Sequence, residues 1–396
     1  MKVLQINAVP YGSTGKIMFS LADQIESEGG ECLCTSGFTW KKPHRDDFFQ
    51  TSNIFEKELH TIQSYITGNL GGYSKVATKK LIKKIDEFKP DIVHLHNIHG
   101  WFVNYELLFA KLKEINVPIV WTLHDCWSFT GQCPHFTMIG CNKWKTKCEN
   151  CQQFDSYPKT RKDFSSQQFE RKKDLFTSLN NLTIVTPSHW LEGLVKESFL
   201  NKYPIEVIHN GINLNIFKPT NSNFRQKYNL KNKYVLLGVS YEWNIKKGLD
   251  VFIELSKQLD EQFQIVLIGT DDEVDKQLPK NIISIHRTQN QEELAEIYTA
   301  ADLFINPTRE DNFPTVNMEA VACGTPVITF NTGGCLEIID KSCGSIIPCD
   351  DIEKLKIEIE TSISKFDYKD CIKKASNFTE IKSNERYLKL YRRLVI

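Results

Sequence analysis

The segment ADLFINPTREDNFPTVNMEAVACGTPVITFNTGGCLEIID, residues 301–340, contains the pattern that decides the fold class. Two short runs of mostly apolar residues, Leu303–Asn306 and Val327–Phe330, predict buried strands. A helix is expected to begin between them, near Pro314. A strand, a helix and a second strand in this order are typical of a parallel α/β sheet.

The same alternation runs along most of the chain. In KKLIKKIDEFKP, residues 79–90, the side chains of Leu81, Ile82 and Ile85 share one helical face, and Pro90 ends the helix. The sequence therefore predicts an α/β protein. The other expected strands are Val3–Asn7, Ile92–His96, Ile119–Leu123, Thr183–Thr186, Glu206–His209, Val235–Val239, Gln264–Ile268 and Ile282–Ile285.

A domain boundary is expected in HNGINLNIFKPTNSNF, residues 209–224, which is rich in turn-forming residues and lacks a hydrophobic period. We predict two doubly wound domains, residues 1–210 and 211–380, with a Cys-rich insertion at 126–151. Residues 381–396 are expected to form a last amphipathic helix that could cross back to the first domain. A chain of 396 residues can form two such cores.

The composition excludes several classes of protein. Lys plus Arg and Asp plus Glu both number 49, and this zero net charge argues against nucleic acid as the main partner. The sequence shows neither an apolar run of about 20 residues nor a secretory signal. We therefore expect a cytoplasmic protein.

A glycine-rich stretch, Gly12–Lys16, follows the first predicted strand, at the edge of the sheet where ligands bind. It is not a Walker A loop, because Pro10 and Ile17 stand where that loop needs a glycine and a hydroxyl residue. Two interpretations remain. The stretch is either a tight turn before a helix that starts near Ile17, or a loop whose small residues let the backbone approach an anion.

Taken in order, the motifs of the chain resemble glycosyltransferase family 4. Besides residues 301–340, they are HLHN at 94–97, WTLHD at 121–125, VTPSHW at 185–190, VIHNGIN at 207–213 and KKGLDVF at 246–252. The resemblance implies the GT-B fold, in which two Rossmann-like domains face each other across a cleft. It also implies retaining transfer of a hexose-type sugar from a nucleotide sugar, by family habit a uridine nucleotide, to an acceptor bound by the first domain.

The resemblance also implies roles for individual residues. Asp311 and Glu319 hold the family's two acidic positions, facing the hexose and the ribose, while Lys247 and the helix start near Pro314 would bind the diphosphate. With Asp311 and Lys247, His124 would complete the catalytic set, in a front-face displacement that needs no cofactor. The other expected donor-binding residues are Gly12, Gly15, Lys246, Glu310, Asn312, Phe313, Thr315 and Val316.

Two departures from the family pattern keep alternatives open. The first acidic position is usually Glu, and here it is Asp311 with Glu310 beside it. An Arg often stands five residues before the family lysine, where this chain has Glu242. The rivals are a catalytically inactive nucleotide-sugar-binding or scaffold protein, and a GT-B epimerase or phosphorylase. Lys247 could also be an ordinary solvated lysine at a helix start.

Four cysteines, Cys133, Cys141, Cys148 and Cys151, are concentrated in a segment with little apolar periodicity. Their number and the C-x₂-C spacing favour a structural zinc site, which would order the segment without taking part in catalysis. Free buried thiols are the first alternative. A disulfide is the second, and is disfavoured in the cytosol.

Family members often use lipid-linked acceptors at the inner membrane face, so peripheral membrane contact is a further hypothesis. The segment 159–176 is rich in Lys and Arg and contains Phe164, Phe169 and Phe176, which could touch a membrane surface. A solvated helix is the alternative.

Overall fold

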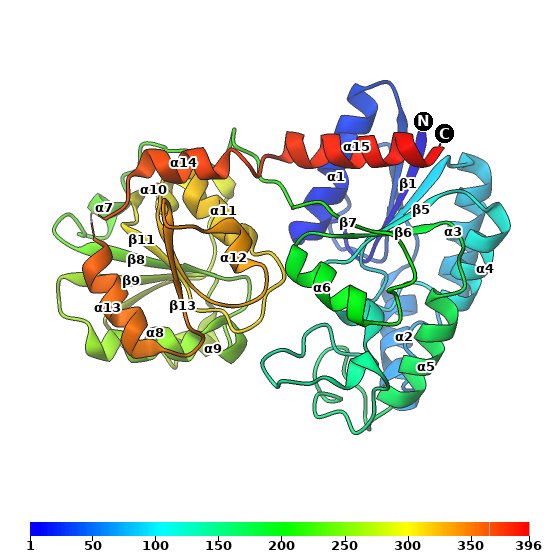
Figure 1. Ribbon diagram of the computed structural model, residues 1–396, viewed down its shortest axis with the longest axis horizontal. Coiled ribbons are helices and arrows are strands. Elements are labelled where there is room, and N and C mark those ends of the chain that lie inside the picture. The colour runs from blue at the N-terminus through cyan, green and yellow to red at the C-terminus, as the bar shows by residue number, and fades with distance from the viewer. Residues whose placement is uncertain (364, 396) are drawn as a thin grey trace. The chain divides into compact units, whose positions relative to one another are not determined.

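The computed structural model describes residues 1–363 and 365–395, whose contacts divide the chain into two α/β units (Figure 1). The first unit comprises Met1–His209 and the chain from Ser383 onward, and the second comprises Asn210–Lys382. Each unit contains one parallel sheet between two helical layers, so the predicted pair of Rossmann-like domains is confirmed.

The strands of the first unit are β1 (Lys2–Asn7), β2 (Glu31–Ser36), β3 (Phe48–Gln50), β4 (Ile92–Leu95), β5 (Ile119–Thr122), β6 (Leu182–Thr186) and β7 (Ile205–Val207). Its helices are α1 (Gly12–Ser27), α2 (Ile54–Thr67), α3 (Lys75–Phe88), α4 (Tyr105–Ile115), η1 (Trp127–Phe129), η2 (Lys143–Lys145), α5 (Ser165–Phe176), α6 (His189–Glu197) and α15 (Glu380–Val395). The sheet order is β3-β2-β1-β4-β5-β6-β7.

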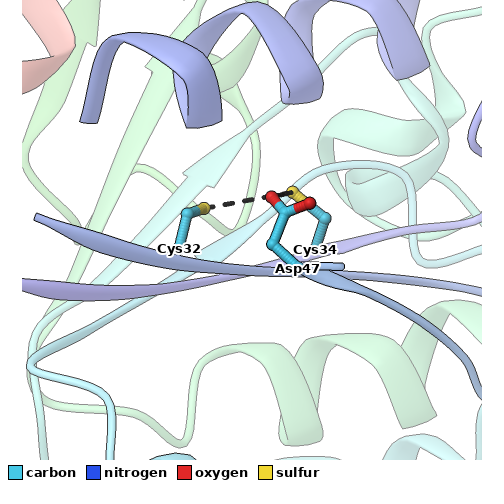
Figure 2. Close-up of side chains that lie close together, drawn as sticks. All are labelled: Cys32, Cys34 and Asp47. Carbon is cyan, nitrogen blue, oxygen red and sulfur yellow. Dashed lines mark hydrogen bonds between the residues drawn. The ribbon is translucent and has the colours of Figure 1, made fainter. Parts of the chain in front are cut away.

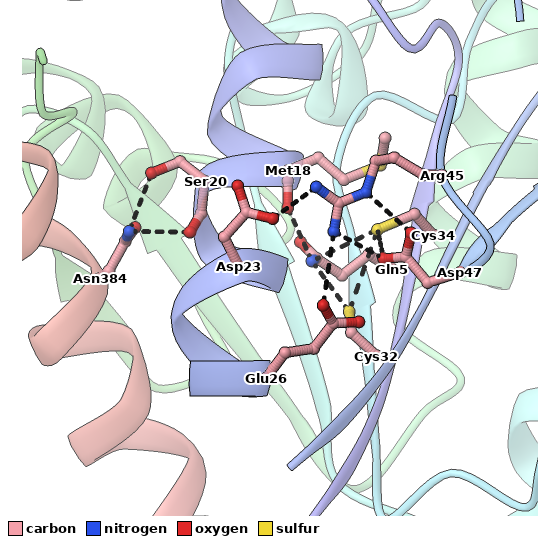
Figure 3. A network of polar contacts seen from close by, with 10 residues as sticks. All are labelled: Gln5, Met18, Ser20, Asp23, Glu26, Cys32, Cys34, Arg45, Asp47 and Asn384. Atoms are coloured by element: carbon pink, nitrogen blue, oxygen red, sulfur yellow. Dashed lines mark hydrogen bonds and ion pairs between the residues drawn. The ribbon is translucent and has the colours of Figure 1, made fainter. Parts of the chain in front are cut away.

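The two faces of the first sheet are covered by different helices. Side chains alternate along each strand, so Val3 lies in the core beneath α1 and α15, whereas Leu4 lies in the core beneath α3, α4 and α5. The C-terminal helix α15 buries Tyr387 and Tyr391 in the first of these cores. Figure 3 shows Asn384 of α15 donating to Ser20 of α1, which fixes the last helix on this unit.

The strands of the second unit are β8 (Tyr234–Val239), β9 (Phe263–Ile268), β10 (Ile282–Ile285), β11 (Leu303–Asn306), β12 (Val327–Phe330) and β13 (Gly344–Ile347). Its helices are α7 (Phe224–Lys227), η3 (Ile245–Lys247), α8 (Leu249–Gln258), α9 (Asp272–Asp275), α10 (Gln291–Ala300), α11 (Thr315–Ala322), α12 (Cys335–Ile338), α13 (Ile352–Ser362) and α14 (Tyr368–Ala375). The sheet order β10-β9-β8-β11-β12-β13 places β8 beside β11.

The structure corrects several predicted elements. Strands β2, β3 and β13 were not predicted. The sequence ECLCTS of β2 contains few β-branched or aromatic residues, whereas FFQ in β3 and GSII in β13 are very short. Helix α1 begins at Gly12, not near Ile17, so most of the glycine-rich stretch is its first turn. Among the described helices, none has both the length and the apolar character that crossing a membrane would require.

Candidate active site

The loops that follow β8 and β11 are fastened together at the carboxyl edge of the second sheet. The backbone N–H of Arg309 donates to the carbonyl of Lys246 over 2.8 Å, and the Thr308 hydroxyl donates to the same carbonyl over 3.3 Å. The Arg309 guanidinium also donates to Asp250 over 2.8 and 2.7 Å and to Asp350 over 2.7 Å. These contacts hold the lysine pair of one loop beside the carboxylates of the other.

Lys247 and Asp311 form an ion pair in this arrangement. The Lys247 ammonium lies 2.7 Å from Asp311 Oδ2 and 3.5 Å from the carbonyl of Glu310. Burial disfavours the ammonium, but the charge of Asp311 outweighs it and raises the pKa of Lys247, which therefore stays protonated. Lys246 lies 3.1 Å from the Glu310 carboxylate. The sequence-predicted charged residues thus come together.

Two glycines let the loops approach this closely. Gly248 has a φ of +74°, and a Cβ there would lie 2.5 Å from the carbonyl of Pro307. Gly333, which lies in the loop after β12, has a φ of +54°, and its Cβ would lie 1.7 Å from the carbonyl of Asp311. Both positions combine a left-handed backbone with no space for a side chain, so they require glycine.

Helix α11 begins at Thr315, shortly after Asp311 in the same loop. Pro314 precedes the helix, and no side chain caps it. The N–H groups of Thr315 and Val316 lie in its first turn, where a helix offers no backbone acceptor of its own. One turn along, Glu319 accepts a hydrogen bond of 3.1 Å from the Tyr298 hydroxyl. Phe313 is buried against Phe378, so its ring contributes to the core. Asn312 is buried as well.

In the first unit, Gly12 and Gly15 differ in the space around their α-carbons. Gly12 has a φ of +68°, and a Cβ there would meet no atom within 4 Å. A Cβ on Gly15 would lie 2.5 Å from the backbone of Pro10. The tight-turn interpretation therefore accounts for Gly15, while Gly12 remains a candidate for close approach to a ligand.

His124 belongs to a buried hydrogen-bonded series. The Gln5 amide Nε2 donates to the carbonyl of Met18 over 2.8 Å (Figure 3). Its Oε1 therefore faces the other way and lies 3.0 Å from His96 Nε2. His96 Nδ1 lies 3.1 Å from His124 Nε2. Burial lowers the pKa of His124 to about 4 and holds the pKa of His96 well below its usual value, so both rings are neutral near pH 7.

This series determines which nitrogen of each ring carries the proton. A carbonyl oxygen only accepts, so His96 must donate from Nε2, and its neutral ring then accepts at Nδ1. His124 must therefore donate from Nε2, and its Nδ1 carries the lone pair. His124 can accept a hydrogen bond through Nδ1 but has no proton there to give. The sequence predicted His124, but not Gln5 or His96 as the groups that orient it.

A second buried series satisfies His94. Its Nε2 lies 2.8 Å from the Thr122 hydroxyl, and its Nδ1 lies 2.6 Å from the hydroxyl of Tyr391 in α15. The Tyr387 hydroxyl lies 2.9 Å from that of Thr122. These contacts give His94 of β4 a structural role.

His99 and Asp125 form another polar pair near His124. His99 Nε2 lies 3.0 Å from Asp125 Oδ2, and its Nδ1 lies 2.9 Å from the Tyr157 hydroxyl. Burial favours the neutral acid, but the charge and hydrogen bond of His99 outweigh it and lower the pKa of Asp125 to about 2. Sequence reasoning assigned no role to this pair, because its members come from separate loops.

The four cysteines of the insertion line one cavity of about 220 Å³. A hydrogen bond from Cys133 lowers the pKa of Cys151 to about 7, and the N–H of Gly131 donates to Cys148 Sγ over 3.1 Å. Within the described residues, no three of these sulfur atoms lie close enough together to bind one ion.

Three other side chains, Cys32, Cys34 and Asp47, do lie within ligand distance of one another (Figure 2). The two sulfur atoms are 3.9 Å apart, and Cys34 Sγ is 3.7 Å from Asp47 Oδ2. Both Asp47 oxygens already accept hydrogen bonds from Arg45, over 2.7 and 2.9 Å, and Gln5 donates to both sulfurs (Figure 3). This cluster therefore helps to fix the Gln5 amide.

The structure contradicts the membrane role proposed for two of the three phenylalanines of residues 159–176, Phe169 and Phe176. Phe169 and Phe176 of α5 are 1% and 0% exposed, because they pack into the core beneath the first sheet. Phe164 is half-buried. The rings of Phe169 and Phe176 cannot touch a membrane surface without unfolding the helix.

Two family models match the chain. The first, described as "Glycosyl transferases group 1", covers residues 220–378, and the second, "Glycosyltransferase Family 4", covers residues 42–216. Two Rossmann-like units, the second with charged loops and a helix start at its carboxyl edge, define the GT-B class of glycosyltransferases. The chain belongs to glycosyltransferase family 4, as its motifs predicted.

Two curated relatives are informative. The chain is 24% identical over 278 residues to the colanic acid biosynthesis glycosyl transferase WcaC of Escherichia coli K12, covering 67% of this chain and 66% of that protein. It is 25% identical over 201 residues to the N,N'-diacetylbacillosaminyl-diphospho-undecaprenol alpha-1,3-N-acetylgalactosaminyltransferase of Campylobacter jejuni, covering 47% and 53%. The matched regions thus span about half to two thirds of these relatives.

Solved structures share the fold over nearly the whole chain. Sucrose-phosphate synthase from Thermosynechococcus elongatus has a TM-score of 0.74 at 16% identity, with 99% of this chain and 98% of that chain covered. Anabaena Alr3699/HepE, solved in complex with UDP and glucose, has a TM-score of 0.69 at 16% identity, with 99% and 100% covered.

Proposed function

We propose that this protein transfers a hexose-type sugar, with retention of configuration, from a uridine diphosphate sugar to a saccharide or lipid-linked saccharide in cell-surface polysaccharide synthesis. The observation that carries the proposal is the contact of Lys247 with Asp311 at the carboxyl edge of the second sheet, in the loop that leads directly into α11. The names of the relatives support the acceptor class, and the complex of Alr3699/HepE with UDP supports the nucleotide.

The diphosphate would bind at the start of α11. An ammonium has three N–H donors, and the contacts of Lys247 with Asp311 and the Glu310 carbonyl leave capacity for a phosphate oxygen. The N–H groups of Thr315 and Val316 add the favourable end of the helix dipole, which is worth about 0.3–2 kcal/mol for an anion. The protonated lysine therefore supplies most of the charge that the leaving group needs.

The sugar and the ribose would contact the two acidic positions. Glu319, oriented by Tyr298, would accept from the ribose hydroxyls, and Asp311 would accept from the hexose. His124 would accept a hydrogen bond at Nδ1 from a hexose hydroxyl. In a front-face reaction the bond from the anomeric carbon to the phosphate oxygen breaks, the acceptor oxygen bonds to that carbon, and its proton passes to the departing phosphate. The protein then orients the reactants and stabilises charge.

The experiment is a panel of nucleotide sugars incubated with the full chain, with and without an undecaprenyl diphosphate-linked saccharide. We expect release of UDP that increases with acceptor, and a product whose anomeric configuration matches the donor's. An inactive binding protein would bind UDP and release none. An epimerase would change the sugar without transfer, and either result would overturn the proposal.

We propose in addition that the cysteine insertion binds one structural zinc ion through Cys133, Cys141, Cys148 and Cys151. All four line one cavity, and the buried Lys172, whose pKa burial lowers to about 7, would be stabilised as an ammonium by the net negative charge of a zinc–thiolate centre. Metal binding would have to draw the sulfur atoms together.

Metal analysis of protein produced with added zinc tests this second proposal. We expect about one zinc ion per chain, lost when Cys148 and Cys151 are both changed to Ser and kept in the exposed control Cys349→Ser. Zinc-free wild-type protein, or an unchanged zinc content in the double variant, would show that these are free thiols.

A further inference from the structure

Helix α2 turns its apolar side outward. Phe55, Leu59, Ile62 and Ile66 are 82%, 57%, 56% and 43% exposed. Their spacing of four, three and four residues places them on one face of the helix, which we call the α2 apolar face. The buried residues of α2 are His60 and Ser64, both polar. This is the reverse of the usual arrangement on a globular domain.

Polar contacts hold the helix in this orientation. His60 Nδ1 lies 2.6 Å from the Ser74 hydroxyl, and the Ser64 hydroxyl donates to the carbonyl of Asn69 over 3.4 Å. Asn53 and Glu56 form a reciprocal capping box at the start of the helix. Hydrogen bonds from His60 Nδ1 and Ser64 thus anchor the inner side of α2, and the apolar face is the side left for a partner.

Lysines of helix α3 and an exposed tryptophan are linked to α2. Helix α3 is joined to α2 by the ion pair of Lys80 with Glu56 at 3.6 Å. Trp40 is 85% exposed and lines one cavity with Lys57 of α2. Glu58 is the exposed acidic residue of α2. The exposed lysines of α3 are Lys75, Lys79, Lys80 and Lys83.

We propose that the α2 apolar face docks on an anionic membrane surface, with the α3 lysines contacting lipid phosphates and Trp40 at the interface. A single convex helix with apolar residues on one side and lysines beside it suits the plane of a bilayer interface. The exposed lysines of α3 complement anionic lipid headgroups, and this charge favours a membrane surface as the partner. The proposal rests on the proposed function, because a lipid-linked acceptor is presented at such a surface.

Vesicle flotation of the full chain tests the proposal. The probes are vesicles of phosphatidylcholine alone and vesicles with about 30% phosphatidylglycerol, at low and high salt. The variants are Leu59→Ser with Ile62→Ser, and Lys79→Gln with Lys83→Gln. The matched control is Ile357→Ser, an exposed apolar residue of α13 that is 53% exposed. Light scattering reports the oligomeric state, and UDP release with a soluble acceptor reports the chemistry.

We expect binding to the anionic vesicles that is weakened by salt, at least tenfold weaker in both double variants and unchanged in Ile357→Ser. The variants should stay monomeric, keep their melting temperature and keep donor turnover with a soluble acceptor. Absent binding at low salt, or equal binding by the double variants, would overturn the proposal. The proposal would also be overturned if the wild-type protein were a dimer that the Leu59→Ser, Ile62→Ser variant dissociates. A lower melting temperature of that variant would overturn it too, because the face would then be packed within the fold. If the wild-type protein binds anionic vesicles but releases no UDP, the proposed function is refuted and the membrane proposal is not.

Discussion

At the scale of single residues, buried hydrogen bonds set protonation as well as position. In the series from Gln5 through His96 to His124, the amide oxygen of Gln5 can only accept a hydrogen bond. It therefore determines which nitrogen of His96, and then of His124, carries the proton. The neutral state of these rings comes from burial. The sequence could predict His124 from its motif. It could not predict Gln5, because a single polar residue in a strand gives no periodic signal.

The variant Gln5→Met keeps the side-chain volume but removes the acceptor for His96. We expect an unfolding free energy lower by about 1–3 kcal/mol, because a buried N–H loses its partner. Nitrogen-15 shifts of labelled histidines should show His124 protonated at Nε2 in the wild type and a mixture of tautomers in Gln5→Met. Thr122→Val, which breaks the separate His94 series, is the control and should leave the His124 signals unchanged. A wild-type His124 protonated at Nδ1 would contradict the assignment.

Burial of His94 makes stability depend on pH. Burial lowers the pKa of His94 to about 3, below the usual value near 6.5, and no carboxylate is among its neighbours His96, Thr122, Tyr387 and Tyr391. The unfolded chain therefore binds one more proton in the window between these values, so stability falls as the pH falls through it.

Urea unfolding between pH 5 and 7 should show this loss. Below about pH 6, wild-type stability should decrease more steeply than that of His94→Gln, by up to about 1.4 kcal/mol per pH unit. Equal slopes for the two proteins would mean that His94 is not held neutral.

At the scale of elements, loops at the carboxyl edge of the second sheet bring the charged residues together. The predicted strands β8, β11 and β12 were correct in type and close in position, because their apolar runs are distinct. The sequence motif placed Lys247 and Asp311 in one site, and the structure shows them in contact. The ion pairs of Arg309 with Asp250 and Asp350, which join these loops, were not predicted, since both partners lie far from Arg309 in sequence.

The loop after β12 depends on Gly333. In Gly333→Ala a side chain would meet the carbonyl of Asp311 and the left-handed backbone would be strained, so we expect a loss of about 1–3 kcal/mol in stability and weaker donor binding. Gly193→Ala in α6, where a Cβ meets no atom within 4 Å, should instead raise stability by about 0.5–1 kcal/mol. Thermal unfolding of both variants checks the contrast in sign, and a neutral Gly333→Ala would contradict the packing argument.

At the scale of the whole molecule, the chain completes its first unit with its last helix. The helix α15 buries Tyr387, Leu388, Leu390 and Tyr391 against the first sheet, and Tyr391 contacts His94. The sequence showed that residues 381–396 form an amphipathic helix, but the pairing of a tyrosine with a histidine 297 positions away has no local signal.

Removal of the chain from Ser383 onward should therefore destabilise the first unit selectively. We expect hydrogen exchange in β1, β4 and β5 to become at least tenfold faster, because their covering core is exposed. Exchange in β8 and β9 should change little, which makes the second unit the internal control. Equal acceleration in both units, or in neither, would show that α15 is not a structural part of the first.

The most direct test of the central claim is calorimetric titration of the full chain with UDP, compared with Lys247→Met and with Lys257→Met. Lys257 lies on α8 and pairs only with an exposed glutamate of its own helix in the described structure. The account predicts that UDP binds the wild type and Lys257→Met equally and binds Lys247→Met about 10- to 100-fold more weakly, as expected for one charge-assisted hydrogen bond to phosphate. Equal affinity for all three proteins would contradict it.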